Sequence, residues 1–486
     1  MTRMRNMMLL SLVMLTVTAA AAADGDLGRR MGELVSGYHE KDLFNGTALV
    51  VSDGEILLRD GYGLADEEWE IPNTPDTKFR LGSITKQFTS MLVMQEVADG
   101  RLRLDQTLSE MLPWYRQDTG GQVTLEQLLN HTSGIPSYTS DPEFFPLHSR
   151  DPLPVRQLVE TYCSGDLEFE PGTQWRYNNS GYVILGAVLE EVTGKPYDAL
   201  LQERILGPLG MDDTGYDHTA EIIPRRARGY QSSPGGLRNA RYLDMSLPHA
   251  AGALYSTVDD LAIWDRALYG TELLSAELKA IMLTPGLEDY AFGWRVATQP
   301  IGPDDSPRTV VTHAGGINGF GTVIVRIPED RNLIVLLDNH GGRNVDSVRT
   351  GLVDLLYGRE PAPPAVPVSR MMLDEIASNG VDAALTRYRE LVATDASGWK
   401  VDEAELNLVG YALLAQGDPD GAVTVFEANA EAYPESFNVY DSLAEGLAAA
   451  GETEEAIRNY ARSLELNPDN TNAIRMLQRL ADVGAD

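Results

Sequence analysis

The sequence predicts an α+β catalytic block followed by an all-α repeat region. Strand patterns lie at the two ends of residues 24–360, and helical periodicity dominates between them. A block that begins and ends in strands favours one antiparallel sheet assembled from both ends, with a helical lobe inserted in the middle. Beyond residue 400, a pattern recurs every 34 residues, which is typical of stacked helix hairpins.

The length and charge of the chain exclude several kinds of protein. Its 486 residues exceed what one hydrophobic core usually holds, about 250–300 residues, so we expect at least two folding units. Lys and Arg number 39 against 72 Asp and Glu, a formal net charge of −33. Such an anionic surface repels phosphate backbones and anionic lipids, which argues against nucleic-acid binding and polybasic membrane docking.

The first 23 residues have the pattern of a secretory signal peptide. Arg3 and Arg5 form a cationic start, an apolar run follows from Met7 to Thr18, and alanines occupy positions 21–23. The sequence leaves open whether this segment is cleaved or stays as a membrane anchor. We expect the catalytic block, residues 24–360, to work in the periplasm or outside the cell.

Two hairpins are predicted at the ends of the catalytic block. Thr47 to Val51 and Glu55 to Arg59 flank the Asp53-Gly54 pair, which is favoured in tight hairpin turns. Thr322 to Ile327 and Asn332 to Leu337 form the second pair of strand patterns. These segments supply the strands of the predicted sheet.

Two helices are predicted between the hairpins. Ser83 to Ala98 carries an apolar stripe and is followed by Gly100, which predicts an amphipathic helix that ends there. Val183 to Val192 predicts a second helix, closed by Gly194.

A proline-rich segment marks the end of the catalytic block. Four prolines fall within residues 361–367, which favours extended polyproline and blocks helix and sheet. We therefore place a domain boundary at residue 360. Residues 361–400 are predicted to hold a linker and a degenerate helical unit around Ala384, Leu385 and Tyr388.

Residues 401–486 resemble tetratricopeptide repeats. Five positions recur at an offset of 34: Gly417, Ala422, Val423, Phe426 and Pro434 return as Gly451, Ala456, Ile457, Tyr460 and Pro468. Such units bury their apolar faces by stacking. The repeats could dock a protein partner or serve as a structural appendage, and the sequence favours neither.

The segment with the clearest chemistry is Ser83-x-x-Lys86. Three residues apart at the start of a predicted helix, the hydroxyl and the amine share one face. A serine hydroxyl is a weak nucleophile until a neighbouring group takes its proton, and a neutral lysine can do so. The alternative is a helix cap followed by a solvated lysine. A second match, Ser397 to Lys400, contains a glycine where a catalytic helix should run.

Two further segments carry candidate site residues. Tyr177 and Asn179 precede the second predicted helix, and their spacing can present a phenol and an amide to the same side. Asn179 could also be only the helix cap. His313 opens a glycine-rich segment near the last strands, where Gly315 and Gly316 allow close approach of the backbone to a ligand.

Together these motifs resemble those of the serine β-lactamase and penicillin-binding superfamily. The Ser-x-x-Lys, Tyr-x-Asn and His-x-Gly elements occur in the order typical of that superfamily. Leu129 to Ile135 is similar to a loop of its class C β-lactamase-related branch, which includes esterases and D-amino-acid peptidases. The resemblance covers residues 30–357 and implies the β-lactamase/transpeptidase-like fold.

The resemblance implies a covalent mechanism. Ser83 would attack a carbonyl and form an acyl-enzyme that water later hydrolyses. Tyr177 would act as general base, because the nearby Lys86 cation would favour its phenolate.

The resemblance also implies how the substrate is held. The backbone N–H groups of Ser83 and Gly316 would form the oxyanion hole. Asn179, His313 and Gly315 would bind and orient the substrate.

The third motif departs from the β-lactamase pattern. His313 stands where the β-lactamases have lysine, and a histidine is mostly neutral near pH 7. This weakens recognition of the β-lactam carboxylate and favours esters or D-amino-acid peptide amides over β-lactams. Asn178 stands where serine is common, which we expect to be tolerated.

The sequence supports three alternatives less well than a secreted serine acyl hydrolase. A non-catalytic binder of cell-wall peptides would have no need to keep Ser83, Lys86 and Tyr177 together. No metal or cofactor is expected, since the seven histidines include no close pair. Cys163, the only cysteine, lies in no catalytic pattern.

Overall fold

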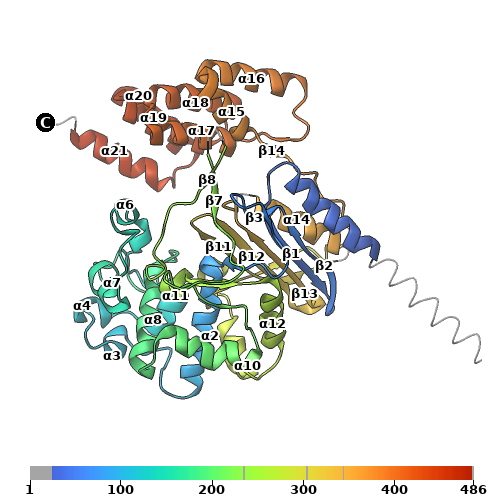
Figure 1. The fold of residues 1–486 in the computed structure, drawn as a ribbon. Helices are drawn as coiled ribbons and strands as arrows, with labels where there is room; N and C mark the ends of the chain where they lie inside the picture. Colours follow the sequence, from blue (N-terminus) through green and yellow to red (C-terminus); the bar gives the residue numbers. More distant parts are fainter. Residues whose placement is uncertain (1–24, 234–235, 303–304, 343, 484–486) are drawn as a thin grey trace, which may run out of the picture. The chain divides into compact units, whose positions relative to one another are not determined.

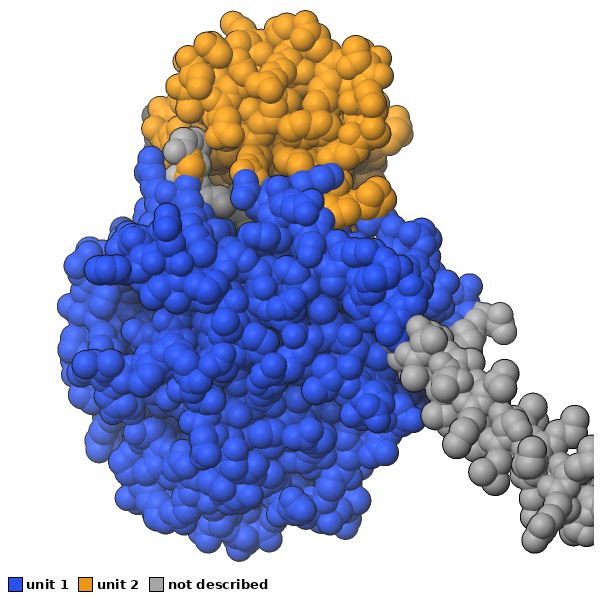
Figure 2. Space-filling model, turned by 45° about the vertical axis from the view of Figure 1, so that its right-hand side comes forward, with its two compact units in different colours: residues 1–232, 237–362 blue, residues 233–236, 363–486 orange. Residues whose placement is uncertain are grey.

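The structure is a computed structural model that describes residues 25–233, 236–302, 305–342 and 344–483. The predicted signal peptide lies outside the described residues. The chain divides into two compact units, residues 1–232 with 237–362 and residues 363–486 with 233–236 (Figure 2). No described helix is both long enough and apolar enough to cross a membrane.

The first unit is built on a six-stranded antiparallel sheet in the order β10-β11-β12-β13-β1-β2 (Figure 1). Strands from the start of the unit pair with strands from its end, as Gly46 opposite Asp338 shows. This confirms the predicted sheet assembled from both ends. The strands are β1 (Gly46–Ser52), β2 (Glu55–Tyr62), β10 (Arg295–Gln299), β11 (Arg308–Ile317), β12 (Phe320–Ile327) and β13 (Asn332–Asp338).

The turns of the two predicted hairpins follow from their sequences. Asp53 and Gly54 have φ angles of 47° and 86° between β1 and β2, which matches the positive angles of a tight hairpin turn. Between β12 and β13, the turn of Pro328–Asp330 ends at Arg331 with φ 51°. Both predicted hairpins are present, with strands one to three residues longer than predicted.

The sheet has an apolar core on each face, because successive side chains of a strand point to opposite sides. Ala48 and Val50 pack in a core with the helix of residues 25–39 and with α14 (Val345–Leu356). Leu49 faces the other core, which joins the sheet to the helical lobe. The helix of residues 25–39 and α14 lie along the same side of the sheet (Figure 1).

The helical lobe is organised around α2 (Thr85–Ala98), which is buried at every residue from Thr85 to Glu96. The prediction of an amphipathic helix is therefore wrong. Polar side chains on its non-apolar face find buried partners: Gln87 accepts a hydrogen bond from Trp264, and Thr89 donates one to the Ala250 carbonyl. The second predicted helix is α8 (Asn179–Thr193), and Gly194 ends it with φ 67°.

The remaining elements of the first unit are short. Its other helices are α3 (Leu108–Met111), α4 (Gln117–Gly120), α5 (Leu125–Leu129), α6 (Phe144–His148), α7 (Val155–Tyr162), α9 (Tyr197–Leu201), α10 (Gly207–Leu209), α11 (His249–Gly252), α12 (Val258–Tyr269) and α13 (Ala276–Met282). Its small strands are β3 (Leu64–Asp66), β4 (Ile71–Pro72), β5 (Phe79–Arg80), β6 (Gly215–Tyr216), β7 (Tyr230–Ser233), β8 (Gly236–Asn239) and β9 (Leu254–Ser256).

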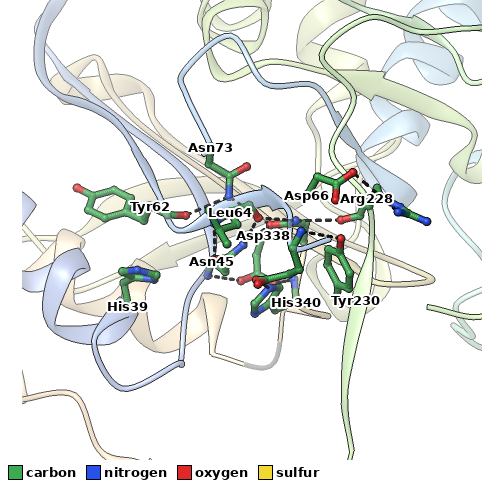
Figure 3. Close-up of polar contacts among 12 residues, drawn as sticks. His39, Asn45, Tyr62, Leu64, Asp66, Asn73, Arg228, Tyr230, Asp338 and His340 are labelled. Atoms are coloured by element: carbon green, nitrogen blue, oxygen red, sulfur yellow. Dashed lines mark hydrogen bonds and ion pairs between the residues drawn. The ribbon is translucent and has the colours of Figure 1, made fainter. Parts of the chain in front are cut away.

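The buried side chain of Asn339, which follows β13, forms hydrogen bonds with four residues elsewhere in the first unit. The Asn339 amide nitrogen donates to the carbonyls of Leu64 at 3.1 Å and Arg228 at 2.9 Å. Its oxygen accepts from the side chains of Asn45 at 2.6 Å and Asn73 at 3.4 Å. Figure 3 shows Asn45, Leu64, Asn73 and Arg228 converging on this point.

The second unit consists of helices, and from residue 403 on equivalent helices recur at a 34-residue spacing. The helices are α15 (Val368–Asn379), α16 (Val381–Thr394), α17 (Glu403–Gln416), α18 (Pro419–Ala432), α19 (Phe437–Ala450), α20 (Thr453–Leu466) and α21 (Thr471–Val483), with the short strands β14 (Val366–Pro367) and β15 (Trp399–Lys400). Gly410 and Gly446 let α17 and α19 approach the buried Phe426 ring, which a Cβ would meet at 2.3 and 2.9 Å. The assignment to tetratricopeptide repeats stays a prediction.

Replacing Asn339 with alanine should destabilise the first unit by about 2–4 kcal/mol, because the Leu64 and Arg228 carbonyls and the Asn45 and Asn73 amides each lose one hydrogen bond. Urea unfolding followed by tryptophan fluorescence measures this change. Asn239→Ala, at an exposed position on β8, serves as the control and should cost less than about 0.5 kcal/mol. Equal losses in both variants would contradict a structural role for the carboxamide.

Candidate active site

Ser83 lies in a single 3₁₀ turn, Gly82–Ile84, that runs directly into α2. Gly82 has φ 55°, and a Cβ there would come within 2.9 Å of the Gly316 nitrogen. Only glycine fits both the left-handed backbone and this close approach. The turn therefore brings the residue before Ser83 against Gly316 on β11, and the oxyanion hole stays a prediction.

The strand β11 is fixed against the same turn. A Cβ on Gly315 would lie 2.0 Å from the Leu81 carbonyl oxygen, so this position also requires glycine. The Thr322 hydroxyl on β12 donates to that carbonyl at 2.8 Å. A Cβ on Gly316 would meet no atom within 4 Å, so the strand faces open space beside Ser83.

Lys86 is fully buried and surrounded by oxygen atoms. Its Nζ lies 3.1 Å from Ser83 Oγ. The same nitrogen donates to Asn179 Oδ1 at 2.9 Å and to the Ala251 carbonyl of α11 at 2.8 Å. Three segments far apart in the sequence thus meet at one amine.

Burial lowers the pKa of Lys86 well below the ordinary value for lysine, because the charged form loses its hydration. Within the described residues, Lys86 forms no ion pair with a carboxylate. Its Nζ lies 4.9 Å from the ring centroid of Tyr177 and 5.4 Å from that of Tyr182. The surroundings of the amine are therefore neutral and favour its uncharged form.

The two asparagines of the second motif make different contacts. Asn178 caps α8, since its side-chain oxygen accepts from the Gly181 N–H at 3.0 Å. Asn179 is the first residue of the helix and is free to turn its oxygen towards Lys86. Its amide nitrogen donates to the Thr139 hydroxyl at 2.9 Å, which fixes that orientation.

The Tyr177 hydroxyl is buried and makes no hydrogen bond of standard geometry with any described residue. Burial raises the pKa of this phenol, and the nearby Ser83 hydroxyl and the Arg295 cation lower it by less. The structure thus places Tyr177 beside Ser83 and Lys86. The phenol remains protonated near neutral pH.

His313 is held as a neutral imidazole on β11. Its Nδ1 lies 2.6 Å from the Ala314 carbonyl, which can only accept, so Nδ1 carries the proton. Its Nε2 then accepts from the Tyr290 hydroxyl at 3.0 Å. Burial, together with the nearby Lys86, lowers the pKa of His313 to about 3.

The loop that resembles a class C feature packs behind Tyr177. His131 has φ 63°, and its Nδ1 accepts from the Asn178 backbone N–H at 3.2 Å. Its ring lies 4.4 Å from the ring centroids of both Tyr177 and Tyr290. The loop therefore supports the second motif, although the sequence assigned no role to it.

Sequence reasoning missed three groups at the site: Ala251, Tyr290 and Tyr182. Ala251 contributes only a backbone carbonyl, which leaves no side-chain signal. Tyr290 lies in no motif. Tyr182 follows Asn179 by three residues, and this one-turn spacing on a predicted helix could have revealed that both face Lys86.

No cluster of three or more histidine, cysteine or acidic side chains suited to a metal occurs in the part of the chain that the structure describes. The seven predicted site residues come from three segments: Ser83 and Lys86, Tyr177 and Asn179, and His313, Gly315 and Gly316. Contacts within and between these segments bring them into one place. This arrangement is a partly exposed serine beside a buried amine, next to the backbone of two other segments.

Comparison with known proteins identifies the family. The sequence matches the family described as "Beta-lactamase" over residues 32–359. The chain belongs to this family. Membership places the first unit among the serine acyl hydrolases of the β-lactamase and penicillin-binding superfamily, and α15–α21 lie beyond the matched residues.

Individual relatives agree with this assignment. The putative penicillin-binding protein PbpX of Bacillus subtilis is 31% identical over 306 residues, which cover 63% of this chain and 73% of that protein. Penicillin-binding protein 4* of the same organism is 29% identical over 321 residues, 62% of this chain and 69% of that protein. The structure of D-amino acid amidase from Ochrobactrum anthropi SV3 with D-phenylalanine matches with a TM-score of 0.60 and 25% identity, covering 68% of this chain and 99% of that chain.

The buried His313 should make stability depend on pH. Its pKa is about 3 in the folded chain, whereas an unfolded histidine titrates near 6.5, so the unfolded state binds more protons between these values. The free energy of unfolding should therefore fall as pH falls below about 6.5. Urea unfolding from about pH 7.5 to about pH 4.5 measures this slope, which should be shallower in His313→Gln than in the wild type. Identical slopes in wild type and His313→Gln would refute the assignment.

Proposed function

We propose that the protein is a secreted serine acyl hydrolase that forms an acyl-enzyme on Ser83, with D-amino-acid amides and esters as its substrates. The observation that carries this proposal is the fully buried amine of Lys86, 3.1 Å from the Ser83 hydroxyl. A lysine in such surroundings is uncharged and can take a proton from serine.

The acceptors around Lys86 orient its lone pair. A neutral amine has two N–H bonds, and Asn179 Oδ1 and the Ala251 carbonyl accept both of them. The remaining lone pair then faces Ser83 Oγ, whose O–H donates to it. Burial lowers the pKa of the Lys86 amine and raises that of the Tyr177 phenol. Lys86 is therefore favoured over a Tyr177 phenolate as the first base.

Acylation then proceeds through a tetrahedral intermediate. Ser83 Oγ bonds to the substrate carbonyl carbon as its proton passes to Lys86 Nζ, and the carbonyl oxygen becomes an oxyanion bound by the N–H groups of Ser83 and Gly316. The Tyr177 O–H, which has no acceptor among the described residues, donates its proton to the leaving amine or alkoxide as the bond to carbon breaks. Lys86 returns its proton to the phenolate. Water hydrolyses the ester in a second round, and Ser83 recovers its proton.

The protonation state of His313 bears on the class of substrate. Its imidazole is neutral, so this motif supplies no fixed cation for a substrate carboxylate at the position of the β-lactamase lysine. The resemblance to a D-amino acid amidase supports an amide of a D-amino acid. The names of the Bacillus relatives make β-lactams the next class to test.

Two further parts of the proposal concern the ends of the chain. Residues 1–23 would direct the protein to the periplasm or the medium. Residues 401–486, with 4 basic and 17 acidic side chains, would present a docking surface for a protein partner or act as an appendage of the catalytic unit.

Ser83→Ala should abolish turnover of a short-chain nitrophenyl ester and of D-phenylalanine amide, a loss of at least about 10³-fold, because no other hydroxyl is activated. Intact-protein mass spectrometry should show a fluorophosphonate adduct on the wild type and none on the variant. Ser397→Ala, in the second Ser-x-x-Lys segment, is the matched control and should behave as wild type. Absence of any adduct and any turnover in the wild type would favour a non-catalytic binder.

The variant Lys86→Arg tests whether Lys86 acts as a base or only as a fixed positive charge. Arginine keeps the charge and cannot release its proton, so kcat/KM should fall at least about 10²-fold if Lys86 is the base. In the wild type, the acid limb of kcat/KM should have a midpoint well below the lysine value of 10.5. Lys195→Arg, at an exposed site, should leave the profile unchanged. Retained activity in Lys86→Arg would favour the phenolate mechanism instead.

A further inference from the structure

Proton transfer to Lys86 creates a positive charge in a site that has no carboxylate to balance it. The nitrogen is fully buried, and among the residues that the structure describes its polar neighbours are Ser83 Oγ, Asn179 Oδ1 and the Ala251 carbonyl. An isolated buried ammonium is costly. The rings of Tyr177 and Tyr182 lie close to the nitrogen, and the imidazoles of His131 and His313 are near enough to interact with it electrostatically.

The Tyr182 ring is held rigidly at this position. It lies on α8, one turn after Asn179, and is fully buried. Its hydroxyl donates to the Leu129 carbonyl at 2.7 Å and lies 3.2 Å from the Ser90 hydroxyl. Both contacts engage the hydroxyl, and Lys86 Nζ lies over the ring itself, 5.4 Å from the centroid.

We propose that Tyr182 is a positioning residue for the reaction, whose ring stabilises the ammonium that forms on Lys86 during acylation. The inference rests on the proposed role of Lys86 as base. The face of an aromatic ring is negative and attracts a cation within about 6 Å, most strongly where water is excluded. Tyr182 is the better test of this effect, because the hydroxyl of Tyr177 also acts on Ser83.

The ring should act on both the basicity of Lys86 and the rate. A ring with a weaker negative face stabilises the ammonium less, which lowers the pKa of Lys86. The acid limb of kcat/KM then moves to lower pH, because the neutral amine persists there. The plateau falls as well, since a weaker base drives proton transfer less.

Fluorination of the ring tests this effect with little change in shape. Tyr182→Phe provides the reference, and mono-, di- and trifluorinated phenylalanines at the same position weaken the ring face stepwise. For a nitrophenyl ester, the plateau of kcat/KM should fall at each step, to on the order of one tenth for the trifluorinated ring. The acid limb should shift down by up to about one pH unit. A flat series would overturn the inference.

Tyr115 offers a matched control series. It is buried, and its hydroxyl donates to the Cys163 carbonyl at 2.9 Å, so fluorination there perturbs packing without touching Lys86. That series should leave kcat/KM and its pH profile unchanged, and equal losses in both series would show a general packing effect and overturn the inference. If Ser83→Ala retained turnover, the proposed function itself would fail. If Lys86→Ala retained acylation, the role of Lys86 as base would fail, and this inference with it. If Lys86→Ala were inactive and the Tyr182 series flat, only this inference would fail.

Discussion

The burial of one amine without a carboxylate is the constraint on which the site depends. Lys86 reaches its position because α2 runs through the middle of the helical lobe and is buried on all sides. Desolvation lowers the pKa of the amine and so favours its uncharged form, which can accept a proton from Ser83. The acceptors that orient it come from α8 and α11, and the neighbouring backbone comes from β11. The antiparallel sheet matters for function because it places β11 beside the start of α2.

Neutral hydrogen-bond partners allow Lys86 to act as a base, whereas a carboxylate partner would prevent this. A buried lysine paired with Asp or Glu is held as an ammonium, because the opposite charge raises its pKa and breaking the pair is costly. Such a lysine cannot serve as a base. Carbonyl oxygens and aromatic faces stabilise the ammonium less than a carboxylate does, so the proton can arrive and leave within one turnover. Asn179 and Ala251 supply this kind of partner, and Tyr177 and Tyr182 add ring faces.

The sequence predicted those parts of the fold that local chemistry determines. The Asp53-Gly54 turn and the Gly194 helix end follow from backbone preferences, and the assembly of the sheet from both ends of the block follows from where the strand patterns lie. The burial of α2 could not be predicted, because its polar residues find partners only in segments distant in the sequence. Likewise, adjacent asparagines look alike in a sequence, and only the start of α8 decides that Asn178 is the cap and that Asn179 reaches Lys86.

The surroundings of the motif groups favour their uncharged forms. Lys86 is desolvated, the Tyr177 phenol keeps its proton, and His313 is neutral with both nitrogens engaged. In the proposed reaction an ammonium and an oxyanion therefore appear together, only when the substrate is attacked. The fixed dipoles around them interact weakly with a neutral ground state and strongly with this pair of charges. Preorganised groups that act mainly on the transition state accelerate the reaction without tightening substrate binding, which is the condition for catalysis rather than recognition.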